Sequence, residues 1–323
     1  MTMRRYRHIA AVLLSLGLAA CGNRQPQSDG TEAVGVSVTR HCKELTPPAM
    51  LEGQDAVEYM LDHCWDFLAD TSGLWLSDSL HLAGVPLPEI EQTFANYSFW
   101  LDSVPDAMAV AKLRSLYARL RDCFGAQDFD RFMDVAKRYL YDPNSPLRNE
   151  DFWQPLAAAL AADPLTPPEL RDSYAYEART CLLNRRGTPA ADFRWSDRDG
   201  VMHRLYDINA DHILLFFSNP GCTACKEIME KLEANPYIGE MIDGGELAVV
   251  NIYIDEDVEA WYGYMSEYPD NWYNGYDPDL VIRTDLLYNV RAIPSLYVLD
   301  ADKRVVLKDA PENRVLAYLE NLR

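Results

Sequence analysis

The sequence predicts an all-α helical domain over residues 41–186, followed by an α/β domain over residues 187–323 with a mixed central sheet flanked by helices. Residues 46–184 carry apolar side chains at helical spacing and contain no β-branched runs. After residue 187, short apolar runs alternate with helical patterns, which is typical of a sheet covered on both faces. About 280 residues follow residue 40, enough for two domains of ordinary size.

Residues 1–20 are expected to be a lipoprotein signal peptide. Three arginines precede a 12-residue apolar stretch, residues 9–20, which is too short to span a bilayer. The stretch ends Leu-Ala-Ala-Cys, which resembles a bacterial lipobox and implies cleavage before Cys21 and attachment of lipid to it. The alternative is an ordinary secretory signal with a cysteine there by chance. In Gram-negative lipoproteins, an aspartate directly after the lipidated cysteine keeps the protein from the outer membrane. Gly22 occupies that position here, which implies the outer membrane. We expect the protein to face the periplasm, although the leaflet and the side stay open.

Residues 21–40 are polar and rich in small residues, as expected of a flexible lipidated tether. The full chain has 30 basic and 50 acidic side chains; removal of the leader, with three arginines and no acid, leaves 27 against 50, a net charge of −23. Such acidity argues against nucleic-acid partners and against attraction to anionic lipid. No other stretch approaches the roughly 18 apolar residues of a membrane span, so the lipid would be the only membrane anchor.

The helical domain is predicted to contain six helices. Asn149 has the right side chain to cap one of them, and two acidic residues in the following turn suit the helix dipole. The other five are expected at residues 56–69, 88–104, 106–124, 128–141 and 167–183.

Four cysteines lie in the helical domain, and an exported protein meets an oxidising compartment. We favour pairing Cys42 with Cys64 and Cys123 with Cys181, because each pair then joins neighbouring elements. Free buried thiols remain an open alternative. A metal site is not expected, because the two His-Cys dipeptides that contain Cys42 and Cys64 lack the tight local spacing of a ligand pair.

The second domain is predicted to open with a hairpin formed by residues 192–195 and 202–205, turning at an Asp-Gly sequence. Further strands are expected at residues 212–217, 247–254, 295–299 and 305–308, and helices at 222–234, 258–267, 280–288 and 312–322. Seven aromatic residues between positions 261 and 276 fit either a groove for an extended partner or simple core packing.

Cys222-Thr-Ala-Cys225 lies where the first of these strands turns into a helix. Backbone N–H groups and the positive end of the helix dipole favour a thiolate there, so Cys222 is the predicted nucleophile. Cys225, one turn deeper, is the predicted resolving thiol. A static disulfide and two small buried side chains are the alternatives; zinc is disfavoured because no second CxxC or CxxH follows.

A CxxC at a strand-to-helix turn, followed by Ile293-Pro294 before a later strand, resembles the thioredoxin superfamily. The resemblance implies that Pro294 is cis, that its loop packs against the cysteines, and that the backbone of Ile293 pairs with a substrate strand. The sequence departs from the pattern at Gly221, where tryptophan is usual, and at residues 213–217, which are wholly apolar where a buried acid is common. Proton transfer to Cys225 would then need another route.

Segments 139–150 and 184–193 resemble bacterial lipoproteins that join a helical domain of unknown function to a thioredoxin-like domain. Segment 139–150 fits either a binding loop or a plain connection between helices. The long segment 255–290 is similar to membrane-anchored thioredoxin-like reductases of the bacterial envelope.

Together these features predict a lipid-anchored envelope thiol–disulfide oxidoreductase, with reduction of protein disulfides as the favoured direction. No nicotinamide or flavin fingerprint occurs, so no cofactor is expected and another protein's thiols would supply electrons. The alternative is a binding module in which the disulfide is structural and the helical domain recognises a partner.

Overall fold

The computed structural model describes residues 38–70 and 73–322, and its N-terminal half is helical as predicted. The predicted helix at 56–69 is interrupted where Trp65 turns into the core, so that a short 3-10 turn follows the first helix. The elements are α1 (Gly53–His63), η1 (Asp66–Ala69), α2 (Leu87–Asp102), α3 (Asp106–Cys123), α4 (Ala126–Leu140), α5 (Glu150–Ala162) and α6 (Pro168–Thr180). A small hairpin, β1 (His81–Leu82) with β2 (Val85–Pro86), was not predicted.

Aromatic side chains fill the centre of the helical half. The Trp65 ring lies edge-on to Phe132 at 5.0 Å between centroids, and Phe94 packs against both. At the start of α5, the side chain of Asn149 accepts a hydrogen bond from the backbone N–H of Asp151, which confirms the predicted cap.

The C-terminal half contains a mixed seven-stranded sheet, which confirms the predicted fold class. Its spatial order is β4-β3-β7-β6-β5-β8-β9. β5 is parallel to β6 and antiparallel to β8, and β6 is parallel to β7. The strands are β3 (Arg194–Ser196), β4 (Met202–Arg204), β5 (His212–Phe217), β6 (Leu247–Tyr253), β7 (Tyr273–Tyr276), β8 (Ser295–Asp300) and β9 (Val305–Leu307).

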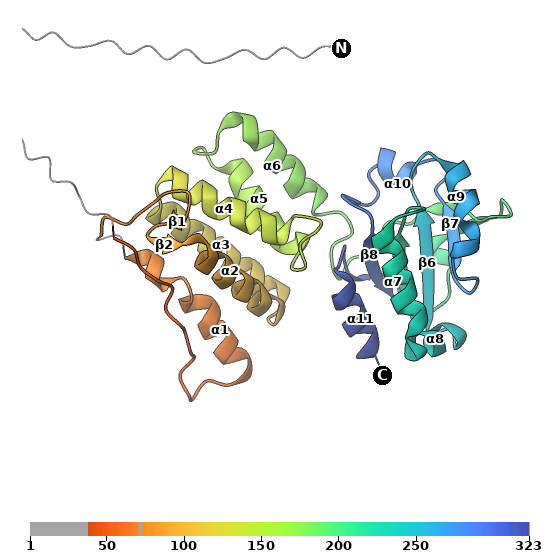
Figure 1. Cartoon of the computed structure of the whole chain (residues 1–323), viewed down its shortest axis with the longest axis horizontal. Coiled ribbons are helices and arrows are strands. Elements are labelled where there is room, and N and C mark those ends of the chain that lie inside the picture. Colours follow the sequence, from red (N-terminus) through yellow and green to blue (C-terminus); the bar gives the residue numbers. More distant parts are fainter. Residues whose placement is uncertain (1–37, 71–72, 323) are drawn as a thin grey trace, which may run out of the picture. The chain divides into compact units, whose positions relative to one another are not determined.

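Helices cover this sheet and join its parallel strands, as Figure 1 shows beside the separate group α1 to α6. They are α7 (Thr223–Ala234), α8 (Pro236–Asp243), α9 (Val258–Tyr264), α10 (Val281–Thr284) and α11 (Glu312–Glu320), with 3-10 turns η2 (Leu205–Asp207) and η3 (Met265–Glu267). Alternate residues of β5 face opposite layers: Leu214 and Phe216 join the cluster under α7 and α11, and Leu215 joins the cluster under α10. Burial on both faces explains why residues 213–217 of β5 are all apolar.

Three elements differ from the prediction. α10 ends at Thr284 rather than residue 288, because Leu286 adopts a left-handed conformation that a helix cannot contain. α8 was not predicted. β7 was not predicted either, and its Gly275 is required because a Cβ there would collide with the indole of Trp195.

None of the helices among the described residues is long and apolar enough to cross a membrane.

Candidate redox site

Cys222 and Cys225 are joined by a disulfide at the N-terminus of α7, with their Cα atoms 5.2 Å apart. Cys222 occupies the cap position, and its Sγ accepts a hydrogen bond from the backbone N–H of Cys225 at 3.2 Å. Cys222 is partly exposed, whereas Cys225 is only 1% exposed. The structure therefore leaves one sulfur open to a partner and covers the other, as the predicted division of roles requires.

Gly221 gives the chain the turn that presents Cys222. Its φ of +71° lies in the left-handed region, which a residue with a side chain adopts only with strain. The usual tryptophan at this place would therefore not suit the local backbone. Apart from the two chain neighbours of Gly221, no atom of the described residues lies within 4 Å of the position that a Cβ would take.

The Ile293–Pro294 peptide bond is cis, which confirms the prediction. This loop and the cysteine helix face each other across a groove with a volume of about 220 Å³. Ala224, which lies between the two cysteines, lines the groove together with Ile293 and Pro294. Ile293 and Cys222 also pack against one apolar cluster. Ile293 and Pro294 thus line this groove together with Ala224, which lies between Cys222 and Cys225 in the sequence.

The groove has a third wall that sequence reasoning did not assign to the site. Pro143, Asn144 and Arg148, from the segment between α4 and α5, also line it. The segment 139–150 therefore connects two helices, as one interpretation predicted, and three of its residues also line the groove.

Polar groups reach the turn before Cys222 from β6 and the loop that follows it. Ser218 donates a hydrogen bond to Asn251 at 2.5 Å, and Asn219 donates one to the carboxylate of Asp255 at 2.6 Å. Burial raises the pKa of the nearby Tyr268 hydroxyl to about 12. β5 itself carries no acid, as its sequence predicted, so Asp255 is the carboxylate that the structure attaches to this turn.

A buried charged network fixes both ends of the cis-proline loop. Asp309 accepts a hydrogen bond from Ser295 at 2.7 Å and pairs with Arg291 at 3.0 Å. Arg291 Nε also lies 2.8 Å from the carboxylate of Glu150, the first residue of α5. Burial raises the pKa of the Asp309 carboxyl against the influence of its cationic neighbours. Burial lowers the pKa of Arg291, but Glu150 and Asp309 outweigh it, so that the pKa is raised overall.

The same network ties the helical half to the sheet. Lys308 Nζ lies 2.8 Å from Glu150 and donates a hydrogen bond to the carbonyl of Cys181 at 2.7 Å. Arg148 donates to the backbone carbonyls of Asp309 at 2.8 Å and Ala310 at 3.0 Å. The wall formed by Arg148 and the loop that carries Ile293 and Pro294 are consequently held by shared partners.

The predicted cysteine pairing in the helical half is wrong, because Cys42, Cys64, Cys123 and Cys181 are all free thiols. Both Cys64 and Cys181, the latter at the C-terminal end of α6, pack in the helical core. Burial raises the pKa of both thiols far above the ordinary value. Among residues 38–70 and 73–322, no group of three or more metal-ligating side chains could hold a metal ion.

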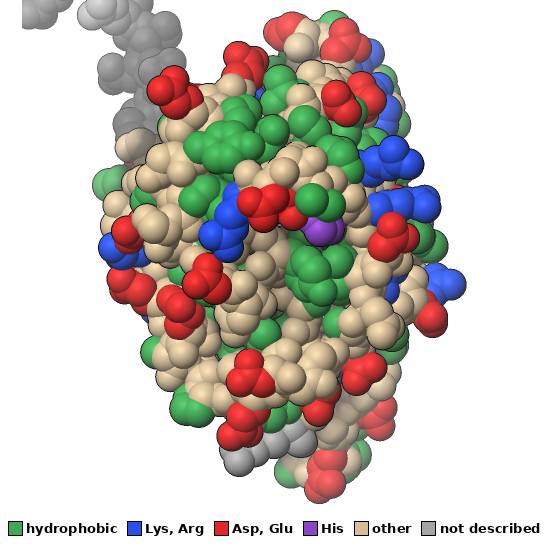
Figure 2. All heavy atoms as spheres, turned by 90° about the vertical axis from the view of Figure 1, so that its right-hand side faces the viewer, with side chains coloured by type: hydrophobic (Ala, Val, Ile, Leu, Met, Phe, Trp, Pro, Cys, Tyr) green, Lys and Arg blue, Asp and Glu red, His purple; other side chains and the backbone are tan. Residues whose placement is uncertain are grey.

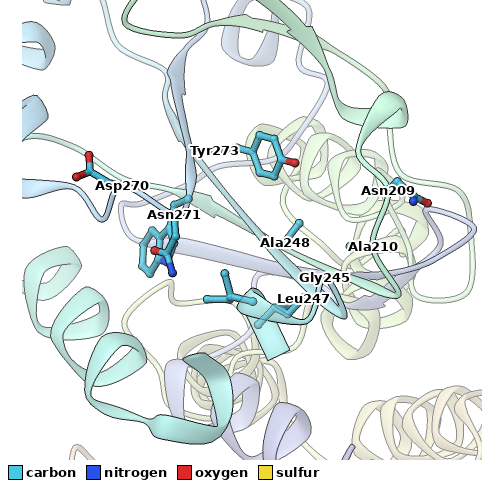
Figure 3. A pocket seen from close by; sticks show the side chains of 10 residues that line it. Asn209, Ala210, Gly245, Leu247, Ala248, Asp270, Asn271 and Tyr273 are labelled. Atoms are coloured by element: carbon cyan, nitrogen blue, oxygen red, sulfur yellow. The ribbon is translucent and has the colours of Figure 1, made fainter. Parts of the chain in front are cut away.

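The aromatic residues at 261–276 mainly pack in the core. Trp261, Tyr268 and Trp272 are buried, whereas Tyr262 and Tyr273 are exposed. A larger pocket of about 300 Å³ lies near Tyr273, at the start of β6. Figure 3 shows that its labelled residues come from β6 and the turn before it, from the first residue of β7, and from the loops around residues 209 and 270. β5 and β6 are parallel, and the cysteines follow the C-terminal end of β5. The pocket at the start of β6 therefore lies at the opposite end of these strands from the cysteines.

Charge on the sheet-bearing half is mixed but mainly acidic. Figure 2 shows acidic side chains spread over the face seen there, with most lysine and arginine side chains near one edge. This face therefore offers no broad cationic surface.

Comparison with known proteins gives the following matches. Residues 20–180 match a family model described as a domain of unknown function, DUF5106. The crystal structure of a thioredoxin-like protein from Bacteroides caccae is 36% identical, with a TM-score of 0.74, over 87% of this chain and 99% of that chain. The C-terminal domain of an uncharacterized protein from Bacteroides fragilis is 44% identical, with a TM-score of 0.41, over 42% of this chain and 98% of that chain.

The thioredoxin domain of a thiol–disulfide oxidoreductase from Bacteroides vulgatus is 19% identical, with a TM-score of 0.38, over 43% of this chain and 97% of that chain. No curated protein matches the chain. The match to the Bacteroides caccae structure confirms the fold class, a helical N-terminal region followed by a thioredoxin-like domain.

Proposed function

The chain belongs to the family of thioredoxin-like proteins that carry a DUF5106 region, and we propose from this premise that it is a lipid-anchored thiol–disulfide oxidoreductase of the cell envelope. The observation that carries the proposal is the placing of a partly exposed Cys222 at a helix N-terminus, beside a cis-proline groove and above a covered Cys225. Reduction of protein disulfides is the direction favoured by the resemblance of segment 255–290 to envelope reductases.

The reaction uses both sulfurs in turn. The Cys222 thiolate attacks one sulfur of a client disulfide, the client S–S bond breaks, and one client thiolate leaves and takes up a proton. A mixed disulfide now joins Cys222 to the client. Deprotonated Cys225 attacks the Cys222 sulfur and releases the second client thiolate, leaving the Cys222–Cys225 disulfide of the structure. Two electrons have passed to the client, and a dithiol protein restores them.

The helix N-terminus supports Cys222 as the attacking group. Its sulfur accepts the backbone N–H of Cys225, and a thiolate accepts such a bond better than a thiol does. Cys225, in contrast, is covered by its neighbours and is reached by the Cys222 sulfur rather than by a client.

Trapping tests this function. Cys225→Ser removes the resolving thiol, so mixed disulfides through Cys222 should accumulate in the envelope and appear on non-reducing gels. The double variant Cys222→Ser/Cys225→Ser is the control and should give no adducts. A folded Cys225→Ser protein with no more adducts than the double variant contradicts the proposal.

The bonded cysteine pair also fits a binding module with a static disulfide. The reduction potential of the pair separates the two functions. A value below about −300 mV is that of a structural disulfide, whereas a more oxidising value fits a reversible redox pair.

We also propose a lipid anchor at Cys21, in the outer membrane and facing the periplasm. Cys21, the signal peptide and residues 21–37 of the proposed tether lie outside the described residues. Protein thiols and disulfides of the envelope are the expected partners. Cys21→Ser should move the protein from the membrane fraction to the soluble fraction and abolish incorporation of labelled palmitate; retention of the label would contradict lipidation at this residue.

A further inference from the structure

The groove beside the cysteines is built from both halves of the chain. Ala224 comes from the cysteine helix and Ile293 and Pro294 from the cis-proline loop, whereas Pro143 and Asn144 come from the segment that joins α4 to α5. A thioredoxin-like domain alone would leave this side of the groove open. The helical half therefore contributes part of the wall of the groove that Ala224 and the cis-proline loop also line.

Hydrogen bonds connect the added wall to the residues that hold the cis-proline loop. The side chain of Arg148 is only 11% exposed, and it donates to the carbonyls of Asp309 and Ala310. Asp309 in turn binds Ser295, which follows Pro294 directly. Because Asp309 contacts both the wall and the loop, the structure links the two sides of the groove without a client present, and a preformed site loses less entropy on binding.

The size of the groove indicates what it accepts. Its volume of about 220 Å³ is below the roughly 300–1,000 Å³ of pockets that take drug-sized ligands or cofactors. It is large enough for a side chain or two. An extended segment that lay along the backbone of Ile293 would direct alternate side chains into such a groove, since successive side chains of a strand point to opposite sides.

We propose that residues 143–148 form a client subsite, which binds the side chains flanking the reactive cysteine in an extended protein segment. The subsite makes the protein selective for disulfides within polypeptides over small-molecule disulfides. This inference rests on the proposed thiol–disulfide exchange and deepens it by naming the residues of the helical half that contact the client.

Asn144→Trp tests the subsite by filling it. Asn144 is exposed and its side chain makes no hydrogen bond among the described residues, so its replacement should leave the fold intact. Asn321→Trp makes the same change at an exposed position outside the groove and is the matched control. Full-length proteins, purified in detergent and reduced beforehand, are mixed with the disulfide-linked dimer of a one-cysteine decapeptide or with 5,5′-dithiobis(2-nitrobenzoate). The second-order rate constant of oxidation is measured for each.

We expect Asn144→Trp to lower the rate constant for the peptide about tenfold, equivalent to about 1.4 kcal/mol, and to change the rate for the small disulfide less than about twofold. Asn321→Trp should match the wild type with both. If Asn144→Trp lowers the rate constant equally for both substrates, or does not lower it for the peptide, the proposed subsite is overturned. A reduced wild-type protein that reacts with neither substrate overturns the proposed function itself, a result distinguishable from failure of the subsite alone.

Discussion

Glu150 provides the sharpest test of how the helical half is joined to the sheet. Its side chain is 1% exposed and lies 2.8 Å from both Arg291 and Lys308, whose side chains are 12% and 2% exposed. Asn289 donates a further hydrogen bond to it at 2.6 Å. Glu150→Gln keeps the shape of the side chain and removes its charge, so that two buried cations lose a common anion.

The loss of unfolding free energy in Glu150→Gln depends on the contacts that Arg291 and Lys308 keep in the variant. Removing one partner of a buried ion pair costs about 3–5 kcal/mol. Arg291 still pairs with Asp309, and Lys308 still donates to the carbonyl of Cys181. Glu150 Oε2 and Arg291 Nε also make no aligned hydrogen bond among the described residues. We therefore expect a loss near the lower limit, about 3 kcal/mol in the free energy of unfolding.

Urea unfolding followed by circular dichroism measures this loss. Glu169→Gln is the matched control, because Glu169 is exposed in the first turn of α6, and it should change the free energy of unfolding by less than about 0.5 kcal/mol. A double-mutant cycle with Lys308→Met should show a coupling of at least about 1 kcal/mol. If Glu150→Gln is no more destabilising than Glu169→Gln, the buried network does not hold the two halves together.

Three further predictions concern stability and thiol reactivity. Burial disfavours the ionised form of Asp197, but hydrogen bonds from His203 and from the hairpin backbone outweigh burial and lower the pKa of the carboxyl. The ionised carboxylate therefore stabilises the fold at pH values above its unfolded pKa, and this stabilisation is lost as the pH falls through its folded pKa. Asp197→Ala should cost about 1 kcal/mol at pH 7 and much less at pH 2 in urea titrations, and an equal cost at both would contradict this sign. Asn149→Ala should cost about 1 kcal/mol of unfolding free energy by loss of its cap, whereas no change in the urea midpoint would show that the cap is dispensable. In the native protein Cys64 and Cys181 should resist iodoacetamide at pH 8 and react only after unfolding, as peptide mass spectrometry would show; fast native labelling would contradict their burial.

Local patterns in the sequence were sufficient wherever short-range physics decides the structure. β5 could be placed correctly because an apolar run of this length fits a strand buried on both faces. The cap at Asn149 was likewise visible, since capping involves only the next few residues. The meeting of Ala224 with Ile293 and Pro294 followed from the resemblance to a known fold rather than from their own chemistry.

Long-range contacts explain what the sequence did not reveal. Glu150 and Asn289 are 139 residues apart, and nothing near either of them marks it as buried. β7 forms because Gly275 lets the indole of Trp195 lie against it, and a pattern of apolar residues carries no record of that contact. The third wall of the groove escaped prediction for the same reason: its Pro-rich segment also has the composition of an ordinary turn.

The contact of Arg148 with the carbonyls of Asp309 and Ala310 has a consequence for how the protein can evolve. A main-chain carbonyl is present whatever side chain a codon specifies. Replacement of Ala310 by another small residue would keep the carbonyl that accepts the hydrogen bond from Arg148. Sequence change at position 310 is therefore compatible with the contact between the two halves. Ser295 and the Asp309 carboxylate meet through side chains instead, and there a change in one is expected to require a change in the other.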